Sequence, residues 1–123
     1  MMLLDTSAVI EFIDGTTRGE RVRQEVEDEI VALSAITVNE LLIIVDAASR
    51  SHILDFVKNA HVIEFDEKIA VRSADLELSL MKKGQQMQKL DAFIAATAVE
   101  KEMILLTCDG DFERVPNLEL VKI

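Results

Sequence analysis

The stretch MQKLDAFIAATAVEKEMILLTCDGDF, residues 87–112, has the pattern of a helix, a strand and a turn in succession. A helical run rich in alanine begins at Asp91, and a short apolar segment at residues 103–106 follows it. An apolar run of this length is typical of a strand that is buried on both faces. Asp109 and Asp111 come soon after that strand. We therefore expect a sheet to fix the position of two carboxylates, with a third carboxylate on the neighbouring helix.

Four other apolar segments have the length of short strands, and helical segments separate them. They are residues 1–4, 30–33, 61–65 and 118–121. Strands that alternate with helices form parallel sheets covered by helices on both faces. We therefore predict an α/β fold of three layers, α/β/α, around a mainly parallel sheet of about five strands. The 123 residues are enough for one hydrophobic core, so we expect a single domain over residues 1–123.

The composition is that of a globular protein with an aliphatic core and an acidic surface. Hydrophobic residues make up 50% of the chain, which has five Phe but no Tyr or Trp. The formal charge of −10 argues against a simple basic patch for nucleic acid, and no aromatic platform is available for stacking bases. No segment has the length and apolarity of a membrane span, and no signal peptide is evident. The single cysteine is consistent with a reducing compartment, so we expect a cytoplasmic protein.

Five acidic residues are predicted to lie at the ends of these elements: Asp5, Glu40, Asp91, Asp109 and Asp111. Each has an ordinary structural explanation when it is taken alone. Asp5 can cap the helix that follows it, and Asp91 in the first turn of its helix favours the helix dipole. Residues 37–40 fit a capping box in which Glu40 accepts a bond from the backbone N–H of Thr37. Asp109 followed by glycine is common in turns.

Taken together, these acids indicate a metal site, because the predicted topology brings them to one edge of the sheet. Two carboxylates about 5 Å apart repel each other by roughly 3 kcal/mol at an effective dielectric constant near 20. A group of four or five needs protons or a cation to offset this repulsion. The chain offers oxygen ligands without a set of His or Cys ligands, which favours Mg²⁺ or Mn²⁺. Through such an ion, an acidic protein can bind a polyanion such as nucleic acid.

Four segments resemble, in order, the successive motifs of PIN-domain nucleases, and in particular VapC-type toxins of toxin–antitoxin pairs. The segments are LLDTSAVIEF (3–12), ITVNELL (36–42), GQQMQKLDAFIAATA (84–98) and LLTCDGDF (105–112). The resemblance implies a Mg²⁺- or Mn²⁺-dependent endoribonuclease, a homodimer and a VapB-type antitoxin as protein partner. It also implies the residues of the site. These are the catalytic, metal-binding acids Asp5, Glu40, Asp91 and Asp109, with Thr6, Thr107 and Asp111 in support.

The sequence departs from the family pattern at two places. Many relatives have an additional acid before the helix, where this chain has Lys89. The ending T-x-D-x-D-F differs from the T-x-N-x-x-D-F form, so Asp109 and Asp111 both remain candidates for the fourth acid. Lys82, Lys83 and Lys89 precede Asp91, and they either hold the RNA backbone or belong to an ordinary solvated helix end.

An apolar run at residues 41–45 lies within a helix that we predict over residues 38–48. Five consecutive apolar residues exceed one helical face, so some of them must face outward or be covered by a partner. We predict that the excess forms a dimer or antitoxin surface.

Three other functions are compatible with the size and pattern of the chain. A receiver domain is disfavoured, because no Asp follows the strand at residues 30–33 and Thr107-Cys108-Asp109 replaces the expected late lysine. A PIN nuclease of RNA processing outside toxin pairs remains an alternative. A catalytically silent PIN interaction module is the third, although such a module has no need of the full acidic set.

Overall fold

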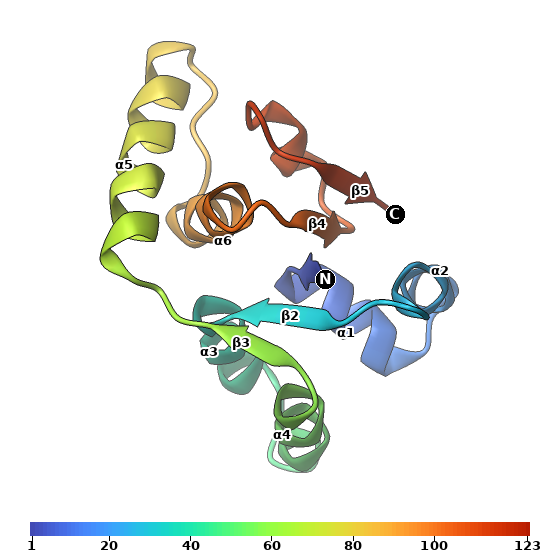
Figure 1. The fold of residues 1–123 in the computed structure, drawn as a ribbon. Helices are drawn as coiled ribbons and strands as arrows, with labels where there is room; N and C mark the ends of the chain where they lie inside the picture. The colour runs from blue at the N-terminus through green and yellow to red at the C-terminus, as the bar shows by residue number, and fades with distance from the viewer.

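The computed structural model describes residues 1–123 and contains a five-stranded sheet between two layers of helices (Figure 1). The strand order is β3-β2-β1-β4-β5, and all four neighbouring pairs are parallel. The strands are β1 (Met2–Leu4), β2 (Val31–Ser34), β3 (His61–Ile63), β4 (Ile104–Thr107) and β5 (Leu120–Lys122). The predicted α/β fold with a central sheet of about five strands is therefore confirmed, and the sheet is parallel throughout.

Helices cover both faces of the sheet, with α5 and α6 on one side and α1 to α4 on the other (Figure 1). Their bounds are α1 (Thr6–Asp14), α2 (Thr17–Val26), α3 (Ala35–Ile44), α4 (Arg50–Lys58), α5 (Glu67–Lys82) and α6 (Lys89–Glu100). A short 3-10 helix, η1 (Gly110–Arg114), connects β4 to β5. None of these helices combines the length and apolarity needed to cross a membrane.

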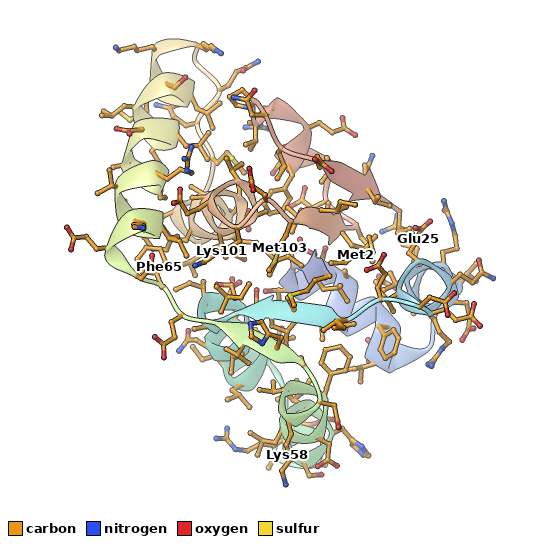
Figure 2. The ribbon with its side chains drawn as sticks, viewed as in Figure 1. Met2, Glu25, Lys58, Phe65, Lys101 and Met103 are labelled. Carbon is orange, nitrogen blue, oxygen red and sulfur yellow. The ribbon has the colours of Figure 1, made fainter.

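The central strands β1 and β4 are rich in apolar residues because successive side chains enter different cores. Leu3 packs into the core beneath α5, α6 and η1, whereas Met2 and Leu4 pack into the core beneath α1 to α4. Leu105 and Leu106 on β4 divide between the two cores in the same way. Figure 2 shows side chains filling the space on both sides of the sheet. This alternation fixes each strand on both faces, so the residues at the strand ends have little freedom to shift.

Helix α3 begins earlier than the sequence predicts. Its N-cap is Ser34, whose hydroxyl accepts a hydrogen bond from the backbone N–H of Ile36 at 3.1 Å, and the helix ends at Ile44. The predicted helix over residues 38–48 is therefore displaced, and the capping box at residues 37–40 is wrong. Thr37 lies inside the helix with its hydroxyl buried and without a hydrogen-bond partner. Glu40 is consequently free of any capping role and extends from the middle of α3.

Helices α1 and α2 approach each other most closely at Gly19, on the buried side of α2. A Cβ atom at this position would lie 2.0 Å from the backbone oxygen of Glu11 and 3.3 Å from the Cα of Phe12. These atoms belong to the main chain of α1 and cannot move aside as a side chain can. Any residue other than glycine therefore has to push the two helices apart.

We predict that Gly19→Ala destabilises the protein, although alanine is intrinsically better than glycine in a helix by about 1 kcal/mol. Overpacking against a backbone typically costs about 1–3 kcal/mol, and the contact here is unusually short, so a net loss is expected. Urea unfolding measures this loss. Gln24→Ala, at an exposed position of the same helix, is the control and should change stability by no more than about 0.5 kcal/mol. A gain in stability for Gly19→Ala would contradict the close approach.

Candidate active site

Five carboxylates come close enough to influence one another beyond the carboxyl ends of the central strands. We call them the acidic cluster: Asp5, Glu40, Asp91, Asp109 and Asp111. They come from four places in the chain, namely the start of α1, the middle of α3, the first turn of α6 and the residues after β4. The sequence predicted all five, and the structure brings all five together.

Asp5 is held firmly by three donors of the chain itself. It follows β1 directly and is 4% exposed. Its Oδ1 accepts bonds from the backbone N–H of Ala8 at 3.0 Å and from the Ser7 hydroxyl at 2.8 Å, and its Oδ2 accepts one from Thr107 Oγ1 at 2.6 Å. The Ala8 bond makes Asp5 the cap of α1, as expected. Burial raises the pKa of Asp5, while these hydrogen bonds oppose the rise.

Two hydroxyl groups connect the end of β4 to the start of α1. Thr107 Oγ1 donates to Asp5 and accepts a bond from the backbone N–H of Asp109 at 2.9 Å. Ser7 Oγ accepts a bond from the backbone N–H of Cys108 at 3.1 Å. Thr107 therefore lies beside Asp5 and Asp109 and is hydrogen-bonded to both of these residues. Ser7 was absent from the predicted site, although it belongs to the D-T-S element, and it is the second residue of the helix that Asp5 caps.

Glu40 reaches the cluster through a contact between helices. The hydroxyl of Thr6, the first residue of α1, donates to Glu40 Oε1 at 2.7 Å. Both side chains are partly buried. Thr6 therefore joins the acid from α3 to the start of α1, the helix that Asp5 caps.

Asp91 is the acid whose charge the chain compensates least. It lies half-buried in the first turn of α6, and no hydrogen bond within the chain lowers its pKa. Burial, followed by the charges of the other four acids of the cluster, raises the pKa of Asp91 from 3.8 to about 6. The cluster therefore contains an uncompensated carboxylate that a cation or a proton would stabilise.

Asp109 and Asp111 differ in their contacts and in how strongly they affect the other acids of the cluster. Asp109 caps η1, because its Oδ1 accepts a bond from the backbone N–H of Asp111 at 2.9 Å, and its charge raises the pKa of both Asp5 and Asp91. Asp111 is exposed and forms an ion pair with Arg114 at 3.0 Å. Of the four neighbouring acids, Asp111 has the smallest effect on Asp91.

The donor set fits a hydrated divalent cation. No group of three acidic, histidine or cysteine side chains is arranged so as to hold a metal ion by itself. Mg²⁺ commonly binds without such a cage, through one or two carboxylates, several waters and the phosphate of a substrate. An uncompensated carboxylate such as Asp91 beside a firmly held one such as Asp5 suits this mode of binding.

The three lysines predicted to hold RNA do not act as one group. Lys89 Nζ forms an ion pair with Glu77 at 3.0 Å and lies 5.5 Å from the centre of the Phe93 ring. It is thereby held against α5 and α6. Lys82 and Lys83 are exposed at the end of α5 and form no ion pair. A groove of about 850 Å³ between α5, α6 and residues 115–117 contains none of the five acids.

Comparisons with known proteins show similarity over nearly the whole chain. The chain is 27% identical over 128 residues to ribonuclease VapC5 of Mycobacterium tuberculosis, which covers 98% of this chain and 92% of that protein. Among solved structures, VapBC2 of Rickettsia felis, bound to a DNA fragment from its promoter, has a TM-score of 0.84 at 22% identity and covers 99% of this chain and 98% of that one. VapBC-5 of Mycobacterium tuberculosis, a member of the VapBC family of toxin–antitoxin systems, has a TM-score of 0.78 at 24% identity, with 99% and 98% covered.

A model of a whole protein family also matches the chain. The model of the PIN domain matches residues 2–118, from the first strand to a point beyond η1. The matched region contains the entire acidic cluster and four of the five strands. Because this match spans nearly the whole chain, the protein belongs to the PIN-domain family.

Proposed function

We propose that the protein is a metal-dependent endoribonuclease and the toxin of a VapBC-type toxin–antitoxin pair. The observation that carries the proposal is the half-buried, uncompensated carboxylate of Asp91 among four other acids. Membership of the PIN-domain family and the similarity to a ribonuclease over 98% of the chain support it. The alternative of a silent interaction module gains no support, because a site without catalysis has no use for a carboxylate that repels its neighbours.

In this proposal Asp5 and Asp91 hold a Mg²⁺ or Mn²⁺ ion, with Glu40 and Asp109 beside them. When bound, such an ion lowers the pKa of a water molecule and neutralises charge on the phosphate. Asp5 contributes a carboxylate that its hydrogen bonds have already oriented. Thr6 keeps the Glu40 carboxylate turned toward the cluster. The two histidines of the chain lie outside the cluster, so proton transfer through a histidine base has no part in the proposal.

We assign the fourth acidic position to Asp109 and not to Asp111. Asp109 influences both Asp5 and Asp91, and only one of its oxygens is engaged in capping η1. Asp111 is already neutralised by Arg114 and is exposed. Lys82 and Lys83 remain candidates for binding the RNA backbone, since their ammonium groups form no ion pair with acids of the chain.

Asp91→Asn should abolish metal-dependent cleavage of single-stranded RNA, because it removes one ligand charge and keeps the shape of the side chain. We expect a loss of at least about 100-fold, since metal-site charge contributes several kcal/mol to such reactions. The measurement compares labelled RNA with the wild type and the variant in Mn²⁺, Mg²⁺ and EDTA. Asp75→Asn, an exposed acid on α5, is the control and should cleave at the wild-type rate. Equal cleavage by the Asp91 variant would refute the site.

Asp91→Asn should also stabilise the metal-free protein at neutral pH. The pKa of Asp91 is about 6 in the folded state, against an ordinary value of 3.8, so between these two pH values the folded state retains a proton that the unfolded state has lost. This carboxyl therefore lowers the stability of the wild type as pH rises from about 4 to about 6. Since Asp91 is half-exposed, solvent screening reduces the effect to about 1 kcal/mol.

Thermal unfolding in EDTA at pH 4 and pH 7.5 tests this linkage. The variant and the wild type should agree at pH 4, and the variant should unfold at the higher temperature at pH 7.5. Added Mn²⁺ should raise the unfolding temperature of the wild type more than that of the variant, because binding to the folded state stabilises it. A variant that is less stable than the wild type at pH 7.5 in EDTA would show that the carboxylate is compensated.

The apolar run on α3 is the proposed contact with a second copy of the chain. Leu41 is fully buried, whereas Ile43 and Ile44 are 72% and 58% exposed. The prediction that part of this run faces outward is confirmed, and two adjacent exposed isoleucines favour a protein partner. The solved VapBC relatives are named for complexes, and one is described as a toxin–antitoxin system, which supports an antitoxin as the other partner.

Ile43→Glu should convert a dimer into a monomer, because a charge placed in an apolar interface has to be desolvated. Light scattering at micromolar concentration measures the change. Ile30→Glu is the matched control, since Ile30 is 62% exposed but precedes β2, away from α3. It should leave the mass unchanged. A dimer that persists in the Ile43 variant, or a wild type that is already a monomer, would contradict this interface.

A further inference from the structure

Arg114, the last residue of η1, connects two segments that both lead to the acidic cluster. Its Nη1 donates to the backbone oxygen of Gln86 at 2.7 Å, and its Nη2 donates to Asp111 Oδ1 at 3.0 Å. Gln86 lies in the loop that enters α6, the helix carrying Asp91. The backbone N–H of Asp111 donates to Asp109. The guanidinium group thus joins the entry to α6 with the turn that holds Asp109.

Apart from the ion pair between Lys89 and Glu77, the entry to α6 has few other polar restraints. Its N-cap, Gln88, makes no side-chain hydrogen bond to the helix, in contrast to the caps of α1, α3 and α5. Gln85, Gln86 and Gln88 are all exposed, and Met87 is the residue of this loop that packs against the core. Backbone groups at an uncapped helix start are free to shift unless a neighbouring segment holds them. Arg114 supplies such a hold just before the first turn.

Arg114 extends from a segment that cannot easily move. Phe112 and Val115, on either side of it, are 1% and 7% exposed and pack into the same core as Ile94 of α6. A planar guanidinium can satisfy two acceptors in fixed directions at once, which a lysine ammonium on a flexible stem does less well. The ion pair with Asp111 therefore orients the guanidinium toward the Gln86 carbonyl.

We propose that Arg114 is a positioning residue of the nuclease site. Its bridge sets the place of the first turn of α6, and hence of Asp91, relative to the turn that carries Asp109. An ion shared by carboxylates from two elements requires their spacing to hold within about 0.5 Å. Arg114 itself touches neither ion nor RNA in this proposal, which rests on the proposed nuclease function. The role of Asp111 is to hold Arg114, and its charge is not needed as a ligand.

Steady-state kinetics on single-stranded RNA at saturating Mn²⁺ provide the first test. Arg114→Ala should lower kcat about tenfold and change KM by less than about twofold, as expected when only the arrangement of catalytic groups is lost. Arg114→Lys should restore less than half of the lost kcat, because one ammonium cannot span both acceptors. Asp111→Asn should lower kcat less than Arg114→Ala does, because asparagine keeps the Oδ1 acceptor but loses the charge that orients the guanidinium group.

Arg72→Ala is the matched control for a lost arginine. Arg72 also joins α5 and α6 through an ion pair, but its partner Glu100 lies at the far end of α6 from Asp91. Its kcat should stay within about twofold of the wild type. Exposed ion pairs contribute little to stability, so all four variants are expected to fold, and circular dichroism checks this.

Hydrogen exchange in the metal-free protein tests the Arg114 bridge independently of RNA cleavage. Peptides spanning residues 86–96 should exchange several-fold faster in Arg114→Ala than in the wild type, and Arg72→Ala should leave that segment unchanged. An unchanged rate in the Arg114 variant would overturn the proposal. A raised KM with unchanged kcat would also overturn it, and would assign Arg114 to RNA contact. If the wild type cleaves no RNA, the proposed function fails, while the exchange result still decides whether the bridge positions α6.

Discussion

The hydrogen bond from Thr107 Oγ1 to Asp5 Oδ2, 2.6 Å long, is the interaction on which the acidic cluster depends. It joins the ends of β1 and β4, which are neighbours at the centre of the sheet. Because Thr107 also accepts from the backbone N–H of Asp109, one hydroxyl places two carboxylates from segments about a hundred residues apart. The two cores hold the strands in register from both faces, so this contact forms without a search among alternatives.

The parts of the structure that were predicted correctly are those that local pattern decides. Short apolar runs such as the one at residues 103–106 are typical of buried strands, and their alternation with helices implies a parallel sheet. Asp5 and Asp109 come soon after such runs, and Asp91 lies at the start of the helix that precedes one, so their convergence follows from topology. Gly15 and Gly84, which follow α1 and α5 in the left-handed conformation, are the residue type that such helix ends favour.

The parts that were missed depend on contacts between distant segments. The start of α3 at Ala35 was missed because Ser34 and Thr37, three positions apart, are both residue types that favour helix caps. In the structure Ser34 is the cap and Thr37 is buried inside the helix. Ser7 and Arg114 contact residues far away in the sequence, Cys108 and Gln86, so the residues around them do not predict these two bonds. Lys89 is likewise held by Glu77 from another helix, a contact that the sequence before Asp91 does not show.

The two central acids, Asp5 and Asp91, differ in a way that suggests a division of labour. Asp5 has donors on both oxygens, so the chain itself fixes its geometry, although burial still raises its pKa. Asp91 has no such donors and faces the charges of its neighbours, so its ionised form is unfavourable until positive charge arrives. A site made only of hydrogen-bonded carboxylates such as Asp5 would be stable but would attract cations weakly. A site made only of uncompensated carboxylates such as Asp91 would attract cations strongly, but the positions of its ligands would be undefined. With both kinds present, the fold fixes the positions of the ligands, and the repulsion at Asp91 provides the affinity for a cation.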